Sequence, residues 1–577
     1  MINRVKVHFT KENKFIEVAE GERLSECIRA AGLTLETPCN GTGVCGKCRV
    51  KVWGDLYPPE ESERGFIDTA HDIRLACLAR VKGDVRIELP SKGSLLKTIN
   101  QGLGIEVEVD SLVKQVLLPV PEKTAQPYLE RLSYNSNSLE IYRKAGELEQ
   151  AQTQQIYGVL FDNTLIDLGS ETGEILGAAI DIGTTGISAY LLDLGTGEIL
   201  HKLSCLNPQT EFGGDVLSRI SYCLENPHGV TQLQETILGK LNELMIDLTR
   251  SAARAERVYQ VVIAGNTTML HFVLGVYPGS IAKSPYRPIF LEPVNMKARE
   301  VGLQICPEGR VTLLPSVSGY VGADILAGVV ATAFDQKDYP AIFLDIGTNG
   351  EIVANLGGRL IATSTAAGPA LEGMNISCGC RAEAGAIDSC SIDDNFELHY
   401  TTIGATSPKG ICGSGLIDLT ATMVKHNIIL TNGRFNPNLD SRLKARVRDK
   451  KFYLTEDIYI SQRDIRQIQL AKGAIAAGVT LLLEEAGTPL EAIEEAVIAG
   501  AFGYHINPES IQGIGLLPKG FMAKITFVGN SSAEGARLAL INKNVMAQIK
   551  ELKGKMEVLE LSTNPRFQDY FVKALSF

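Results

Sequence analysis

The chain has no long hydrophobic run and no excess of basic residues. No apolar stretch reaches the roughly 18 residues that a membrane-spanning helix needs. The net charge of −11 argues against nucleic acid as a partner, because phosphate backbones attract basic surfaces. Residues 1–8 lack the apolar segment typical of a signal peptide. These absences predict a cytoplasmic protein that acts on neither nucleic acid nor membrane.

Length and cysteine content narrow the class of protein further. The 577 residues are too many for one domain, so three or four domains are expected. A hydrophobic content of 45% and a charged content of 21% are ordinary for globular proteins. The chain has twelve cysteines, which in a reducing cytoplasm indicate metal ligands and free thiols rather than disulfides.

Four of the cysteines form a pattern near the N-terminus. Cys39, Cys45 and Cys48 lie in a glycine-rich loop with five and two residues between them, and Cys77 follows after 28 more. A [2Fe-2S] cluster needs four thiolates, and glycines let the backbone wrap closely around it. Zinc sites usually have two close cysteine pairs or histidine ligands, whereas this loop has one close pair and no histidine. The pattern predicts a [2Fe-2S] cluster, with spacing that resembles the adrenodoxin-type ferredoxins.

The residues around this loop indicate a β-grasp ferredoxin-like domain over residues 1–92. Short segments alternate between apolar and polar residues, as strands with one buried face do. Cys27 is expected to be a buried thiol on a short helix rather than a ligand. The expected elements are strands at 5–9, 15–18 and 84–89 and a helix at 25–31.

A strand–turn–strand unit occurs twice in the second part of the chain. Residues 178–195 and 341–357 each contain an apolar strand, the sequence Asp-Ile-Gly-Thr, a glycine and a second strand. This repeat predicts a duplicated α/β domain over residues 173–577, with a cleft between halves of about 173–340 and 341–577. Residues 93–172 are predicted to be a linker and a small middle domain, with a strand at 105–109.

Both turns contain the residue types that phosphoryl transfer needs. Asp181 and Asp345, each at the end of a buried strand, can hold Mg²⁺ through water. The glycines and threonines that follow offer N–H and hydroxyl groups to phosphates. Glu351 is a candidate for orienting the attacking water, and a solvent-facing strand position explains it equally well. The predicted phosphate contacts are Gly183, Thr184, Thr185, Gly347, Thr348, Asn349 and Gly350.

This layout resembles the superfamily of acetate and sugar kinases, Hsp70 and actin, which has a ribonuclease H-like fold. Residues 497–503 resemble its adenosine motif, and residues 261–268 resemble its connecting motif. The second segment reads equally as a buried strand ending in a polar turn. Lys472 lies on a helix expected at 463–486 and is a candidate ribose or adenine contact, against a solvated helix lysine. The further nucleotide contacts implied are Asn266, Gly368, Gly500, Ala501, Phe502 and Gly503.

A [2Fe-2S] domain joined to such an ATPase resembles the ATP-dependent reductive activators of corrinoid proteins over nearly the whole chain. The resemblance implies ATP-dependent, one-electron reduction of inactive Co(II) corrinoid protein to active Co(I). It implies a [2Fe-2S] cluster, ATP and Mg²⁺ as cofactors. It implies a corrinoid methyltransferase protein and an unidentified reduced electron donor as partners, and often a homodimer. Besides the cysteine loop and the two turns, it is carried by residues 207–209, 212–216, 265–271, 321–324, 366–373, 409–415 and 470–478.

Three other functions stay open. The chain could activate another low-potential enzyme of the radical dehydratase type, although those activators hold one cluster between two subunits. It could be a small-molecule kinase with an accessory electron-transfer domain, for which Asp324 is the candidate catalytic residue; helix N-capping explains Asp324 as well. It could also be an electron-transfer adaptor in which ATP is structural.

The remaining cysteines and two histidines have simpler interpretations. The spacing of Cys378, Cys380, Cys390 and Cys412 matches no standard metal site, so single thiols are expected. His271 and His505 are expected to pack or to hydrogen-bond, because no acidic partner is evident for acid–base catalysis.

Overall fold

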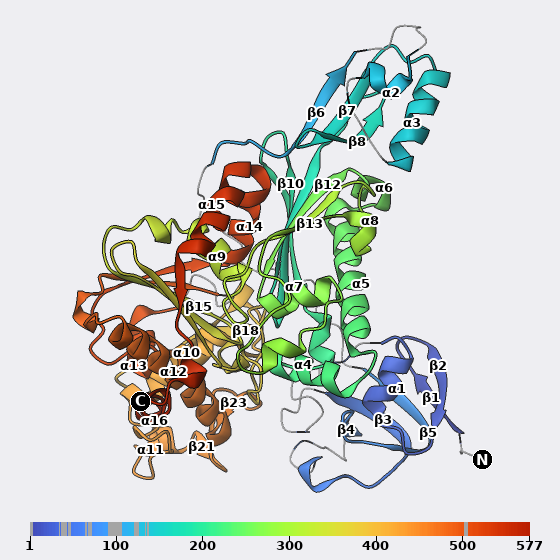
Figure 1. The fold of residues 1–577 in the computed structure, drawn as a ribbon. Helices are drawn as coiled ribbons and strands as arrows, with labels where there is room; N and C mark the ends of the chain where they lie inside the picture. Colours follow the sequence, from blue (N-terminus) through green and yellow to red (C-terminus); the bar gives the residue numbers. More distant parts are fainter. Residues whose placement is uncertain are drawn as a thin grey trace.

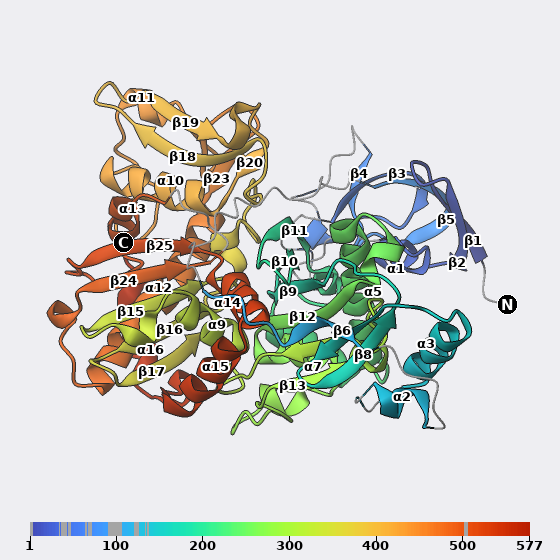
Figure 2. The same ribbon diagram turned by 90° about the horizontal axis from the view of Figure 1, so that it is seen from above.

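Two large lobes and two small domains make up the molecule in the computed structural model (Figure 1). Both small domains attach to the first lobe, at its opposite ends (Figures 1 and 2). Within the described residues, no helix combines the length and the hydropathy needed to cross a bilayer. The structure describes residues 4–33, 35, 43, 48–63, 66, 72–89, 107–119, 126–132, 134, 138–500 and 506–577.

The N-terminal domain is a five-stranded sheet with the order β2-β1-β5-β3-β4, against which α1 packs. Strands β1 and β2 form an antiparallel hairpin, and β5 lies parallel to β1. The predicted strands and helix of this domain are confirmed, because their apolar side chains, such as Val7, Phe9 and Ile28, are buried in one core. The elements are β1 Arg4–Phe9, β2 Lys14–Ala19, α1 Leu24–Ala30, β3 Arg49–Leu56, β4 Ile73–Leu75 and β5 Val81–Glu88.

A small domain with its own core follows. It consists of the antiparallel sheet β6-β7-β8 (Val113–Leu118, Ile156–Phe161 and Thr164–Gly169) and two helices, α2 (Tyr128–Arg131) and α3 (Leu139–Gln150). The strand predicted at 105–109 is wrong for residues 107–109, the part of it that is described. There the backbone runs beside the end of a distant helix, since Asp110 N donates to Ile541 O and Asn542 Nδ2 donates to Glu108 O, both at 2.9 Å.

The first lobe is built on a six-stranded sheet with the order β11-β10-β9-β12-β14-β13. Strands β9, β10 and β11 are antiparallel neighbours, and β12 lies parallel to β9. The strands are β9 Leu176–Ile182, β10 Gly186–Asp193, β11 Ile199–Leu206, β12 Val258–Gly265, β13 Val294–Lys297 and β14 Arg310–Leu313. The helices are α4 Val216–Glu225, α5 Gly229–Thr249, α6 Ala252–Ala255, α7 Thr267–Val273 and α8 Ala298–Val301.

The second lobe repeats five of these strands, with the strand order β25-β24-β15-β16-β17-β26. Its sixth strand, β26, pairs with β17, whereas β13 of the first lobe pairs with β14, at the other edge of the sheet. Its strands β15, β16 and β17 are antiparallel neighbours, and β24 lies parallel to β15. The predicted duplication is therefore confirmed. The strands are β15 Ala341–Ile346, β16 Gly350–Asn355, β17 Leu360–Thr365, β24 Glu495–Ala499, β25 Lys524–Gly529 and β26 Met556–Val558.

Helices cover the sheet of the second lobe, and two small sheets are inserted between β17 and α12 (Gln462–Glu485). The predicted helix at 463–486 is observed as α12, which begins with a capping box between Ser461 and Asp464. The other helices are α10 Gly413–Lys425, α11 Ser441–Lys444, α13 Pro508–Ile514, α15 Lys543–Lys555 and α16 Phe567–Ala574. The inserted strands are β18 Ala386–Ile392, β19 Leu398–Thr402, β20 Gly410–Ile411, β21 Val447–Arg448, β22 Lys451–Tyr453 and β23 Tyr459–Ser461.

Two helices join the lobes. Helix α9 (Ala323–Ala331) packs against α14 (Ser531–Ile541) between the two sheets (Figure 2). A Cβ atom on Gly535 would lie 2.1 Å from the carbonyl oxygen of Ala327, so only glycine allows this close approach. Because both helices begin beside the predicted turns, they place their N-terminal residues where the lobes meet.

Candidate functional site

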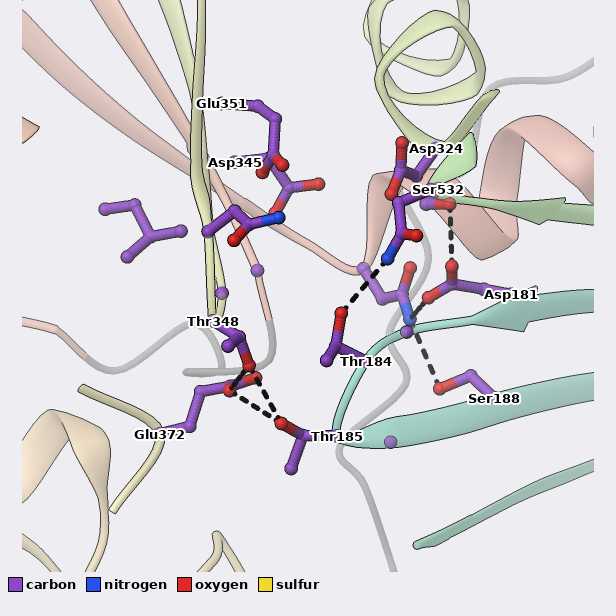
Figure 3. Close-up of a pocket in the computed structure, with 18 residues that line it drawn as sticks. Asp181, Thr184, Thr185, Ser188, Asp324, Asp345, Thr348, Glu351, Glu372 and Ser532 are labelled. Atoms are coloured by element: carbon purple, nitrogen blue, oxygen red, sulfur yellow. Dashed lines mark hydrogen bonds between the residues drawn. The ribbon is translucent and has the colours of Figure 1, made fainter. Parts of the chain in front are cut away.

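The two Asp-Ile-Gly-Thr turns face each other across a cavity of about 130 Å³ between the lobes (Figure 3). The first turn (residues 183–185) joins β9 to β10, and the second turn (residues 347–349) joins β15 to β16. The cavity is smaller than the ~300–1,000 Å³ typical of small-molecule sites, so the turns must separate to admit a whole nucleotide. The predicted residues that line it are Asp181, Gly183, Thr184, Thr185, Asn266, Asp345, Gly347, Thr348, Asn349, Glu351 and Gly500.

A carboxylate that the sequence did not single out links the two turns. Oε2 of Glu372 accepts hydrogen bonds from the hydroxyls of Thr185 at 3.0 Å and Thr348 at 2.7 Å (Figure 3). The two hydroxyl oxygens lie 2.9 Å apart. Burial raises the pKa of Glu372, and these two hydrogen bonds act in the opposite direction. One oxygen atom therefore occupies the place where both threonines could hold a phosphate oxygen.

Asp181 is held by the helix that arrives from the other lobe. Its carboxylate accepts from Asn530 Nδ2 and from Ser532 Oγ, each at 2.9 Å. Asn530 is the N-cap residue of α14, so its backbone position is fixed by the same helix. Burial raises the pKa of Asp181 although both hydrogen bonds lower it. Neither Asn530 nor Ser532 belongs to a motif that can be recognised in the sequence.

Three further carboxylates, those of Asp324, Asp345 and Glu351, also line the cavity. Burial, followed by the charge of Asp181, raises the pKa of Asp324 to about 7. The pKa values of Asp345 and Glu351 are raised well above their ordinary values, first by burial and then by neighbouring carboxylates that include Asp324. None of the described residues that line the cavity is basic. A cavity with this charge suits a hard divalent cation.

The carboxylates do not form a closed metal site by themselves. Within the part of the chain that is described, no three Asp, Glu, His or Cys side chains lie close enough together to hold an ion. Mg²⁺ keeps several waters and binds through one or two carboxylates together with substrate phosphates. The donors present fit Mg²⁺ in that manner, with Asp181 and Asp345 on opposite sides of the cavity (Figure 3).

The structure decides between the alternatives left open for Glu351 and for the polar turn that contains Asn266. Glu351 is 8% exposed and lines the cavity, so the solvent-facing alternative is wrong. Asn266 donates from Nδ2 to Thr184 Oγ1 at 3.0 Å and caps α7 by accepting from Met269 N at 3.0 Å. The polar turn after β12 is therefore directed at the site.

Lys472 does not line the cavity, and it is not solvated either. Its ammonium group donates to the carbonyl oxygen of Ser576 and lies 5.1 Å from the ring centroid of Phe577. Burial lowers the pKa of Lys472 to about 8. Gly350 and Gly368 are also not among the cavity residues. The predicted contacts Ala501, Phe502 and Gly503, and also His505, lie outside the described residues.

Two of the four predicted cluster ligands lie side by side in the N-terminal domain. The sulfur atoms of Cys48 and Cys77 are 3.2 Å apart, and each residue is 1% exposed. The pairing of Arg49 with Leu75 and the bond from Ala76 N to Cys48 O, at 2.9 Å, hold the two segments together. These thiols fit a shared metal cluster shielded from solvent. Cys39 and Cys45 lie outside the described residues.

A glycine and a buried ion pair support this site. Gly43 has φ +72°, and a Cβ atom there would lie 2.3 Å from a methyl group of Leu78, so the loop requires glycine at this position. Glu63 is fully buried and accepts from Arg74 Nε at 2.7 Å and from Leu75 N at 2.9 Å. Both contacts fix the strand that leads to Cys77.

Three other cysteines, Cys27, Cys390 and Cys412, are buried thiols, and His271 is held by hydrogen bonds to the backbone. Cys27 is buried on α1 as predicted, and burial raises its pKa to about 12. Cys390 is also buried with its pKa raised to about 12, first by burial. Cys412 donates to Ile387 O at 3.3 Å. His271 Nε2 accepts from Ile289 N at 3.0 Å, and Nδ1 lies 2.7 Å from Thr267 O, which confirms a hydrogen-bonding histidine.

Three protein families match parts of the chain. Residues 7–82 match the family described as 2Fe-2S iron-sulfur cluster binding domain. Residues 176–337 match the RACo middle region, and residues 340–577 match the C-terminal domain of RACo, the ASKHA domain. The last two matches meet between the two lobes.

Several known proteins are similar to the chain. The corrinoid activation enzyme RamQ of Eubacterium limosum is 30% identical over 612 aligned residues, which cover 99% of both chains. The [Co(II) methylated amine-specific corrinoid protein] reductase of Methanosarcina barkeri is 26% identical over 70% of this chain and 77% of its own. The solved structure of a reductive activator for corrinoid, iron-sulfur protein has a TM-score of 0.77 and 34% identity, with 99% and 98% of the two chains covered.

Proposed function

Because the chain belongs to the family of reductive activators of corrinoid proteins, we propose that it uses ATP to reduce an inactive Co(II) corrinoid protein to the active Co(I) form. The [2Fe-2S] domain delivers the electron, and the two-lobed domain binds ATP. The observation that carries this proposal is the combination, in one chain, of paired buried cysteines with a carboxylate-lined cavity between duplicated turns.

ATP is needed because the electron transfer is uphill. Plant-type [2Fe-2S] clusters have reduction potentials of about −400 mV. In this proposal the Co(II)/Co(I) couple of the corrinoid lies lower. Each ~59 mV of shortfall for one electron costs about 1.4 kcal/mol. A gap of ~100–200 mV therefore costs roughly 2–5 kcal/mol, which ATP can supply by binding two conformations of the complex with different affinity.

In the N-terminal domain the chain's task is to hold and shield the electron carrier. When bound, the cluster supplies one electron. Cys48, just before β3, and Cys77, just after β4, would hold it, and the predicted ligands Cys39 and Cys45 would complete the set. The fully buried Glu63 keeps the second strand in place through Arg74 and Leu75. Burial of both sulfurs excludes water from one side of the site.

In the cavity the chain's task is to position phosphates. Thr184, Thr185 and Thr348 present hydroxyl groups to them. The N–H groups of Gly183 and Gly347 instead donate within their own turns, to Gly186 O and Asn349 O at 2.9 Å each. Asp181 and Asp345 orient the waters of Mg²⁺. Glu351, which pairs with Asp345 across β15 and β16, orients the attacking water. These roles are part of the proposal.

Further assignments complete the proposal. The partner is a corrinoid protein of a methyltransferase system, reduced by a donor whose identity the chain does not specify. The protein is a cytoplasmic homodimer. The domain boundaries are 1–92, 93–172 and 173–577, with the division of the last domain near residue 340, where two family matches also meet.

The test is ATP turnover and Co(I) formation with anaerobically reconstituted protein, a reductant and a Co(II) corrinoid carrier. Co(I), followed by visible absorption, should form only with Mg-ATP, and the carrier should stimulate ATP hydrolysis. Cys48→Ser should abolish reduction, and Cys27→Ala, which removes a thiol that is not a ligand, should retain it. Phosphorylation of a metabolite without any Co(I) would support the kinase alternative instead.

A further inference from the structure

A buried arginine contacts the first turn without lining the cavity. Arg219, on α4, is fully buried and donates from Nη2 to the carbonyl oxygen of Thr184. It also donates from Nε to Gly213 O at 2.9 Å and from Nη1 to Gln209 Oε1 at 3.3 Å. These acceptors are uncharged, and a desolvated cation held this way is costly. Its position behind the first turn therefore calls for a function.

The same helix belongs to the surface against which the N-terminal domain packs. The guanidinium carbon of Arg29, on α1, lies 5.3 Å from the centroid of the Phe212 ring. Phe212 in turn packs against the ring of Tyr222 on α4, with centroids 4.9 Å apart. Figures 1 and 2 show this edge of the N-terminal domain against the first lobe. We call Phe212 and Tyr222 the docking surface.

Helix α1 is tied to the segment that holds the last cluster cysteine. Leu24 N donates to Ala79 O at 2.9 Å, and Ser25 N donates to Ala76 O at 2.8 Å. Cys77 lies between these two acceptors. A series of direct contacts therefore runs from the first turn to Arg219 on α4. It continues from the docking surface to α1, and from α1 to the segment that contains Cys77.

We propose that the docking surface is a nucleotide-responsive binding site for the N-terminal domain, with Arg219 as the positioning residue between it and the first turn. This inference rests on the proposed binding of nucleotide in the cavity. Because nucleotide phosphates are polyanionic, their presence beside Thr184 attracts the buried guanidinium and holds α4 in the orientation that binds Arg29. By linkage, docking of the domain raises nucleotide affinity by the same factor.

The experiment is hydrogen exchange of the full, reconstituted chain under anaerobic conditions, with and without Mg²⁺ and a non-hydrolysable ATP analogue. The segments read are 183–185 in the first turn, 212–222 in the docking surface and 24–30 in α1. Two variants are compared: Arg29→Ala, which removes the cation from Phe212, and Arg86→Ala, which removes an exposed arginine from β5 of the same domain.

The analogue should slow exchange in all three segments of the wild type and of Arg86→Ala. In Arg29→Ala the analogue should slow exchange in residues 183–185 and 212–222 but not in residues 24–30. The affinity for the analogue should fall about two- to fivefold, as expected for loss of one cation–π contact. Cluster absorption and basal ATP hydrolysis should be unchanged in both variants.

Arg219→Lys tests the positioning role separately. Lysine keeps the charge, but its single nitrogen cannot reach the acceptors that Arg219 contacts from three different nitrogens. The analogue should still protect residues 183–185, and its effect on residues 24–30 should disappear, which a merely structural residue would not cause.

Two results would overturn the proposal. One is protection of the first turn in the wild type without any change in α1; the other is an undiminished response of α1 in Arg29→Ala. If residues 183–185 themselves do not respond, nucleotide does not bind in this cavity, and the proposed function fails together with the inference.

Discussion

The two lobes share five strands in the same order, but they place different chemistry at equivalent positions. Asp181 pairs with Ser188 across β9 and β10, and Asp345 pairs with Glu351 across β15 and β16. In the first lobe the aspartate accepts hydrogen bonds from Asn530 and Ser532. In the second lobe the aspartate lies among carboxylates, and burial together with their charges raises its pKa. Duplication has set the geometry, and divergence at one register position has set the charge.

The comparison predicts that Glu351 and Ser188, the residues paired with the two aspartates, contribute very differently to ATP hydrolysis. Glu351→Gln should lower ATP hydrolysis about 10²–10⁴-fold while nucleotide still binds, because a general base is lost. Ser188→Ala, at the equivalent position of the first lobe, should lower hydrolysis less than about threefold. Measurement of kcat together with nucleotide affinity checks both. Equal losses in the two variants would show that the lobes do not differ in this way.

The two aspartates should affect stability to different extents. Burial raises the pKa of Asp181 as well, but its carboxylate accepts hydrogen bonds from Asn530 and Ser532, so Asp181→Asn should raise the Tm of the nucleotide-free protein less than Asp345→Asn does. The pKa of Asp345 is raised by folding, so its ionised form costs stability at pH values above its unfolded pKa. Asp345→Asn should therefore raise Tm at pH 8. Thermal unfolding of both variants decides this, and a lower Tm for Asp345→Asn would contradict the account.

The buried carboxylates of the cavity, Asp324 in particular, should make Mg²⁺ binding depend on pH. The folded-state pKa of Asp324 is about 7, so in the metal-free protein this group gives up its proton as pH rises through 7. A protonated carboxyl cannot attract the cation, so Mg²⁺ affinity should rise up to about tenfold between pH 6 and 8. Calorimetric titration measures it. Asp324→Asn should flatten the dependence, and an unchanged slope in that variant would assign the proton elsewhere.

Glu372 should compete with phosphate for the two threonines that join the lobes. Replacing it by alanine frees the hydroxyls of Thr185 and Thr348 and removes a negative charge. Affinity for ATP should rise about three- to tenfold, which is the scale of one ordinary hydrogen bond. Fluorescence titration with a labelled nucleotide measures the change. A lower affinity would mean that Glu372 helps to hold Mg²⁺ instead.

Local sequence patterns predicted most of what positions the site. Apolar strands followed by Asp-Ile-Gly-Thr predicted both hairpins, and the repeat predicted that their turns face each other. The ferredoxin strands and α1 followed from the alternation of apolar residues. In each case the signal lies within one short segment, so no knowledge of tertiary contacts was required.

The residues that sequence reasoning missed act over long separations. Glu372 contacts Thr185 across 187 positions, and Asn530 contacts Asp181 across 349. Lys472 is drawn away from the cavity by the carbonyl of Ser576, which is 104 positions further along. The wrong strand over residues 107–109 has the same origin, because Glu108 O accepts from Asn542 Nδ2, and Asp110 N, just after the segment, donates to Ile541 O. A tertiary contact overrode the local pattern there.

The most direct test of the account is the amount of Co(I) formed on a corrinoid carrier by the reduced, cluster-loaded protein, measured by visible absorption with and without Mg-ATP. The account predicts reduction with Mg-ATP and little reduction without it, and the same low level with Mg-ATP in Glu351→Gln. Equal reduction in the absence of nucleotide would contradict it.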